Sequence, residues 1–109
     1  MNSWDIVSQV RRRTREEEGA LHSRAPFRIA LCYPSRYSVG MSSLGFQTIY
    51  REIHSHPGAA AERAFLPDTP GDYRRQRMPV FTYENETPLS DFPVVAFSIS
   101  YGTATATTP

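Results

Sequence analysis

The chain has 109 residues, enough for one domain, and its formal net charge of +1 excludes a strong overall attraction to nucleic acid or to an anionic membrane. A single cysteine, Cys32, excludes an intramolecular disulfide and a cysteine-based metal cluster, which favours a reducing, cytoplasmic setting. Because no apolar run approaches the roughly 20 residues of a membrane helix and no signal-peptide core is present, we expect a soluble protein.

The first 26 residues are predicted to form a helical arm and a linker. Ser3 is a candidate N-cap, and we expect Trp4 to dock on an apolar surface. A short apolar stripe lies here at helical spacing and consists of Trp4, Ile6, Val7 and Val10. The charged run 11–18 places three glutamates after four arginines, which favours a solvated helix over a phosphate-binding face. Residues 20–26 then serve as a linker.

Residues 27–53 are predicted to form a strand, a loop and a helix, the first half of a βαβ unit. The run 29–32 is apolar on both alternating faces, as in a strand buried in a parallel sheet, and Pro34 is expected to end its ladder. Residues 35–40 form the loop. A helix over 41–53 follows, capped by Ser42 or Ser43.

The loop between this strand and this helix is the first place to look for a ligand. Ligands bind at the carboxyl ends of parallel strands, and a helix N-terminus favours phosphate or other anions. Gly40 and Gly45 bracket the first helical turn, where each serves either close packing or approach of a ligand to the backbone. The spacing matches neither the dinucleotide fingerprint nor the Walker lysine motif, so both interpretations stay open.

Two histidines, His54 and His56, follow the helix. They favour a solvated helix end over a metal site, because no third ligand is evident nearby.

Residues 59–66 are predicted to form the second strand, parallel to the first by a right-handed crossover. Asp68, Thr69 and Pro70 resemble a helix start and predict a short polar helix over 70–77.

The last third of the chain contains one strongly apolar segment. Residues 79–84 are predicted to form a short strand or hairpin arm, and residues 85–88 a turn. Residues 93–100 are almost continuously apolar, which predicts a buried parallel strand with neighbours on both sides. The tail, residues 102–109, has neither a helical nor a strand pattern, so we expect an unstructured tail and an incomplete domain.

Four ordered blocks give the chain a more specific likeness. They are Arg28–Pro34, Tyr37–Tyr50, Glu62–Pro67, and Pro88–Phe92 followed by Val94–Tyr101. Together these blocks, within residues 16–101, resemble the N-terminal, cobalamin-binding-like domain of a group of bacterial radical SAM proteins. The expected fold class is α/β: a partial Rossmann-like three-layer sandwich with a short parallel sheet in flavodoxin-like order, over residues 27–101, after the N-terminal helix.

The resemblance implies that the partner of this domain is a radical SAM barrel. In that family the barrel carries the three-cysteine motif that binds an iron-sulfur cluster and cleaves S-adenosylmethionine. The chain departs from the family because it stops before the barrel, and because a Thr/Ala tail stands where the family has a Glu and a further helix. A truncated or frameshifted product fits both departures. We therefore expect no catalysis by this chain alone and no catalytic or metal-ligating residues in it.

Cobalamin is the one cofactor that the resemblance suggests for this part of the protein. The loop 35–40 has no histidine, so ligation of cobalt through the Asp-x-His-x-x-Gly loop of cobalamin modules is excluded. A weak or vestigial site without protein ligation is the expectation. Its candidate residues are Pro34, Ser35, Tyr37, Gly40, Met41, Ser42, Leu44 and Gly45 after the first strand, with Ser98, Ser100 and Tyr101 after the third.

An alternative function belongs to a different class. The chain could be a small non-catalytic module that binds an anionic ligand with the loop 35–43, or a partner chain with the unpaired edge of its sheet. The apolar segment 93–100 is the feature that distinguishes these two functions. An apolar strand at the edge of a sheet tends to pair or aggregate, so a soluble monomer would need something to cover that edge. Neither interpretation predicts nucleic acid or a membrane as a partner.

Overall fold

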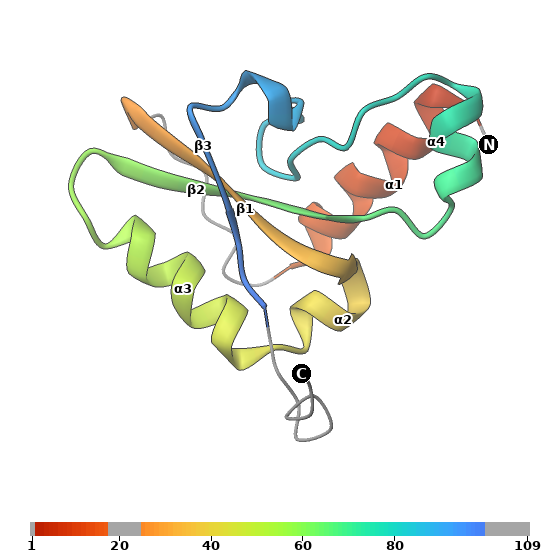
Figure 1. Ribbon diagram of the computed structural model, residues 1–109. Coiled ribbons are helices and arrows are strands. Elements are labelled where there is room, and N and C mark those ends of the chain that lie inside the picture. Colours follow the sequence, from red (N-terminus) through yellow and green to blue (C-terminus); the bar gives the residue numbers. More distant parts are fainter. Residues whose placement is uncertain (1, 18–24, 100–109) are drawn as a thin grey trace, which may run out of the picture.

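The α/β class that the sequence predicts is confirmed by a computed structural model, which describes residues 2–17 and 25–99. In chain order, the elements are α1 (Ser3–Glu16), β1 (Phe27–Arg36), α2 (Tyr37–Met41), α3 (Leu44–His54), β2 (Ala59–Leu66), α4 (Pro70–Arg75), the 3₁₀ helix η1 (Leu89–Asp91) and β3 (Val94–Phe97) (Figure 1). No helix within the described ranges is both long and apolar enough to cross a membrane.

The three strands form one parallel sheet in the order β2-β1-β3. β1 lies in the middle, where Ile29 pairs with Ala61 of β2 on one side and with Val94 of β3 on the other. The chain passes from β1 to β2 through α3, so the predicted βαβ unit is confirmed. The order 2-1-3 is the flavodoxin-like order that the sequence predicts.

The core lies mainly between the sheet and α3. Phe46 and Tyr50 of α3 are fully buried, and the Phe46 ring packs edge-on against Tyr33 of β1 and Phe65 of β2, each at 5.4 Å between ring centroids. The opposite side of the sheet is covered by the segment from Met78 to Phe92, which includes η1 (Figure 1). In the same view α4 lies beside the N-terminal half of α1.

Three predictions about the β1–α3 connection need correction or refinement. β1 continues through Pro34 to Arg36. Proline has no backbone N–H to donate, and an irregularity in the β1–β2 pairing between Tyr33 and Arg36 accommodates its absence. The expected loop 35–40 is instead the end of β1 followed by the short helix α2. The predicted cap is confirmed at Ser43, whose hydroxyl accepts a hydrogen bond from the Phe46 amide at 3.2 Å.

At the N-terminus the cap is one residue earlier than predicted. Asn2, not Ser3, caps α1, and it forms a capping box with Asp5. The expectation that Trp4 docks on an apolar surface holds only in part: Trp4 lines a depression with apolar residues that include Val7 and Phe81, but it is 64% exposed. The interpretation of 11–18 as a solvated helix holds only in part, since the Glu17 side chain is 4% exposed. Residue 18 and most of the linker lie outside the described residues.

The C-terminal third differs most from the predictions. Residues 79–84 form no regular strand, but they form the predicted hairpin arm in a short version. An antiparallel bridge joins Phe81 to Pro88, and backbone hydrogen bonds run from the Thr82 amide to the Thr87 carbonyl at 2.9 Å and from the Leu89 amide to the Val80 carbonyl at 3.2 Å. β3 pairs with β1 as predicted, but it is not buried, because within the described residues nothing pairs with its other edge. The helix predicted over 70–77 is confirmed as α4 and ends at Arg75. The predicted tail 102–109 lies outside the described residues.

Candidate functional site

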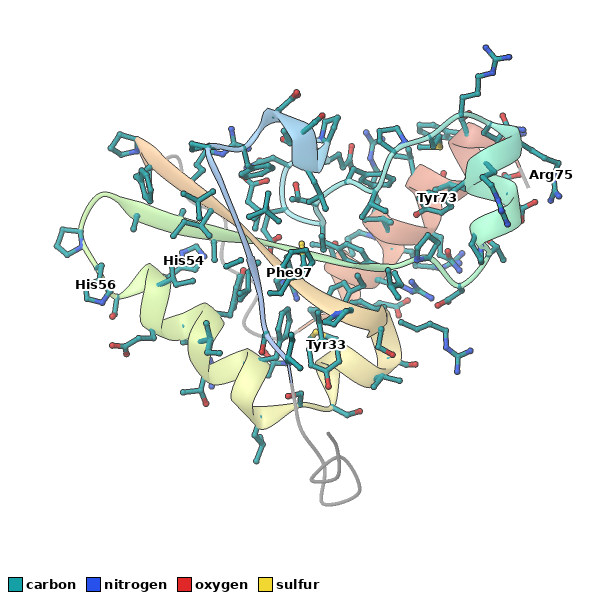
Figure 2. The ribbon with its side chains drawn as sticks, viewed as in Figure 1. Tyr33, His54, His56, Tyr73, Arg75 and Phe97 are labelled. Carbon is teal, nitrogen blue, oxygen red and sulfur yellow. The ribbon has the colours of Figure 1, made fainter. Side chains whose placement is uncertain are left out.

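Described residues at the carboxyl ends of the strands, where ligands bind in parallel sheets, line a small pocket of about 80 Å³. Its walls are apolar side chains of the three strands and the covering segment: Cys32, Tyr33, Pro34, Ala64, Phe65, Leu66, Val80, Leu89 and Phe97. Figure 2 shows Tyr33 and Phe97 near each other at this end of the sheet. Burial raises the pKa of the Cys32 thiol, which therefore stays protonated and unreactive at neutral pH.

Of the predicted ligand-binding residues, Pro34 lines this pocket, and Ser98 directly follows the lining residue Phe97. The Ser98 amide donates a hydrogen bond of 2.9 Å to the Cys32 carbonyl, which continues the β1–β3 ladder by one step. Ser35 precedes the last residue of β1 and is half-buried. The positions of Ser100 and Tyr101 lie outside the described residues.

Three further predicted residues, all in α2, contact the protein interior. Tyr37 donates a hydrogen bond from its hydroxyl to Glu17 at 2.5 Å and stacks on Tyr83 at 5.0 Å. Met41 lies with its sulfur 3.5 Å from a guanidinium nitrogen of Arg63. A Cβ placed on Gly40 would come within 2.4 Å of the Phe65 ring, so this glycine serves close packing between α2 and β2. These contacts place Tyr37, Gly40 and Met41 against other side chains of the protein itself.

The remaining predicted residues surround the start of α3 and face solvent. Leu44 is 83% exposed, and a Cβ on Gly45 would meet only the Ser43 hydroxyl at 3.9 Å. The Ser42 hydroxyl donates to the Ser38 carbonyl at 2.9 Å. Among the described residues, the candidates do not converge on one cavity: those of α2 contact the interior, Pro34 lines the small apolar pocket, and those at the start of α3 lie on an open surface.

A buried ionic network was not predicted from the sequence. Arg63 of β2 donates from Nε to Glu84 at 2.5 Å and from Nη2 to Glu17 at 2.7 Å, and its side chain is 1% exposed. The Tyr50 hydroxyl donates to Glu84 at 2.8 Å. Burial alone would lower the pKa of Arg63, but Glu84 and Glu17 raise it above the ordinary guanidinium value. The feature of the sequence that could have revealed this network is the charged pair Glu62-Arg63 inside an otherwise apolar strand.

The two histidines lie apart from this network. His54 points from α3 toward β2, where its Nε2 lies 3.0 Å from the Ala61 carbonyl oxygen and 3.2 Å from the Ala61 amide (Figure 2). His56 lies in the following turn, exposed, with Glu52 at 3.8 Å. Within the described ranges, no three metal-ligating side chains come together.

Fold and site together define an α/β domain built on a short parallel sheet of order 2-1-3. Its strand ends carry a small apolar pocket. A family model described as "Radical SAM proteins, N-terminal" matches residues 45–108, which is more than half of the chain. The chain belongs to this family of N-terminal domains of radical SAM proteins. No curated protein and no solved structure matches the chain.

Proposed function

We propose that this chain is a non-catalytic accessory domain that acts beside a radical SAM barrel. The observation that carries the proposal is membership of the N-terminal domain family. Iron-sulfur clusters are held by several cysteine thiolates, and the chain has one cysteine, which is buried and protonated. The thiolates needed to cleave S-adenosylmethionine must therefore come from the barrel.

The exposed edge of β3 is the surface that we assign to the barrel. At the other edge of the sheet, β2 is already covered: the Tyr83 amide donates to the Arg63 carbonyl at 2.8 Å, and Glu84 accepts from the Arg63 amide at 2.7 Å. β3 has no such cover within the described residues. Its apolar residues Val94, Val95 and Phe97 are exposed, and so is Ile99, two residues after the strand. An apolar edge strand of this kind favours pairing with a partner.

Cobalamin does not fit the strand ends that the structure describes. The pocket there holds about 80 Å³, against about 300–1,000 Å³ for ordinary ligand sites. Of the two glycines predicted for backbone approach, Gly40 is covered by the Phe65 ring, and Gly45 lies on an open surface outside this pocket. We therefore propose that any cobalamin site in this domain is vestigial, and we derive no chemical step through this cofactor.

The non-catalytic part of the proposal is tested by anaerobic reconstitution. The purified chain is incubated with ferrous iron and sulfide, desalted, and assayed with S-adenosylmethionine and dithionite. We expect no bound cluster by absorbance and no 5′-deoxyadenosine above a reaction without protein. Stable cluster binding with formation of 5′-deoxyadenosine would overturn this assignment.

The partner is tested by association with a barrel. The probe is the barrel of a radical SAM protein from the same family, expressed without its own N-terminal domain and mixed with this chain during sedimentation. We expect a complex that Val95→Lys weakens by about tenfold, because the added charge lies at the apolar edge. Thr48→Lys adds the same charge on exposed α3 and should leave the complex intact. Absence of a complex, or equal effects of the two variants, would contradict the assignment of β3.

A further inference from the structure

Two adjoining pockets lie between α1, which precedes the segment that matches the family, and residues 78–88, which belong to that segment. The first holds about 350 Å³ and is lined by Trp4, Val7, Arg11, Met78, Pro79, Phe81, Glu86 and Pro88. The second holds about 390 Å³ and is lined by Arg11, Thr14, Arg15, Tyr83, Glu84 and Glu86. Because Arg11 and Glu86 line both, the two pockets form one continuous depression, here called the α1 groove.

The first compartment of the α1 groove is apolar and has an aromatic rim. Trp4 is 64% exposed although it belongs to the apolar stripe of the helix, and the Arg11 guanidinium lies 5.3 Å from the centre of its indole ring. Phe81 is buried, and two prolines complete the walls. An exposed tryptophan beside an apolar depression is the arrangement found at energetically dominant positions of interfaces.

The boundary between the compartments is an ion pair. Arg11 binds Glu86 in a bidentate manner, with Nε to Oε2 at 2.8 Å and Nη2 to Oε1 at 3.0 Å. The two opposite charges cancel, so the ion pair shapes the α1 groove but adds no net charge to it. It also holds Arg11 in place against Trp4.

The second compartment carries an uncompensated positive charge. The Glu84 carboxylate is occupied by Arg63 and Tyr50, and the Glu86 carboxylate by Arg11. Arg15 is exposed and forms no ion pair within the described part of the chain. This compartment is therefore complementary to an anionic group, and the neighbouring one to an apolar side chain.

The length of the α1 groove indicates the kind of ligand. Trp4 and Arg15 lie three helical turns apart, about 16 Å at the rise of an α-helix. An extended peptide covers that span with about five residues. We propose that the α1 groove binds an extended acidic peptide segment of a partner protein, with an apolar side chain beside Trp4 and a carboxylate beside Arg15.

The proposal is tested by peptide selection against the whole chain. Random heptapeptides displayed on phage are selected on the immobilised protein, and the dissociation constants of synthetic versions are measured by fluorescence anisotropy. We expect enriched peptides to carry an aromatic or large aliphatic residue with Asp or Glu four or five positions away, the spacing that spans about 16 Å in an extended chain. A selection without this pattern would overturn the proposal.

Three variants locate the binding site. Trp4→Ala and Arg15→Glu should each weaken binding of a selected peptide by about tenfold. Arg12→Glu makes the same charge change on the next turn of the same helix but outside the groove lining, and it should change binding by less than about threefold. All three residues are exposed, and melting curves verify that the variants fold. Binding that neither Trp4→Ala nor Arg15→Glu weakens would also overturn the proposal.

Discussion

Glu17 and Arg63, which lie 46 residues apart in the chain, form an ion pair of 2.7 Å with both side chains almost completely buried. Glu17 is the C-cap of α1 and Arg63 lies in the middle of β2. The pair therefore fixes the N-terminal helix to the sheet. Because a buried charge is costly without its partner, this contact specifies the position of α1 more strongly than the exposed pair of Arg11 and Glu86 does.

Removal of Arg63 should strongly destabilise the protein. Arg63→Ala leaves the carboxylates of Glu17 and Glu84 buried without their cation, and we expect a loss of about 3–5 kcal/mol in the free energy of unfolding by urea. Arg12→Ala, at an exposed position, should stay within about 0.5 kcal/mol of the parent protein. A loss below about 1 kcal/mol for Arg63→Ala would contradict the buried network.

Alanine substitutions at Gly40 and Gly45, between β1 and the start of α3, should change the stability of the protein in opposite directions. Gly40→Ala places a methyl group 2.4 Å from a Phe65 ring atom, and that ring is itself packed against Tyr37, Phe46 and Tyr83. We expect a destabilisation of about 1–3 kcal/mol by urea unfolding. Gly45→Ala fills open space in α3 and should stabilise by up to about 1 kcal/mol. Equal effects would show that α2 does not pack on Phe65 as described.

His54 and His56 provide a second matched pair. His54→Ala removes the side chain that meets the backbone of Ala61 at the edge of β2, and we expect a loss of about 1 kcal/mol in thermal or urea unfolding. His56→Ala, at an exposed position, should be close to neutral. If the His56 variant loses as much stability as the His54 variant, the contact with β2 is not the cause.

Alkaline pH should lower the stability of the protein. Burial raises the pKa of Tyr73 to about 12, and burial with the nearby Glu17 raises the pKa of Tyr37 above its ordinary value. Because unfolded tyrosine has a pKa of about 10, the folded state holds these protons longer. The resulting stabilisation is complete below about pH 10 and is lost as the pH rises toward 12.

Melting temperatures between about pH 9 and pH 11 measure this effect. The chain has no lysine, so the tyrosines, together with Cys32, whose pKa burial also raises, dominate the titration in this range. Tyr73→Phe should reduce the fall in melting temperature, because it removes one of the groups whose pKa is raised in the folded state. An unchanged fall in this variant would contradict the burial of the Tyr73 hydroxyl.

The elements with a strong local pattern could be predicted from the sequence. The apolar run 29–32, the Ser43 cap and the helical spacing of Phe46 and Tyr50 specify β1 and α3, and the crossover rule then specifies the parallel pairing of β2. The resemblance to the N-terminal domain of radical SAM proteins rests on four blocks within 16–101, and the match to the N-terminal domain family covers 45–108.

The candidate site was harder to predict, because its residues act through contacts that are distant in sequence. Gly40 was a candidate for ligand approach, but the ring that covers it, Phe65, belongs to another strand. Arg63 was not singled out in the sequence, because its partners Glu17 and Glu84 come to it from other parts of the chain only in the folded protein. Local patterns contain no information about such pairs, nor about which edge of β3 stays exposed.

We propose that the domain acts through its surfaces and not through a bound cofactor, because the pocket at the described strand ends is small and apolar and the Phe65 ring covers Gly40. The most direct test is a titration of the purified chain with hydroxocobalamin, followed by absorbance and by melting temperature. A ligand that binds only the folded state must raise the melting temperature. We predict a cooperative melting transition that does not shift with hydroxocobalamin; saturable binding with an increase in melting temperature would contradict the claim.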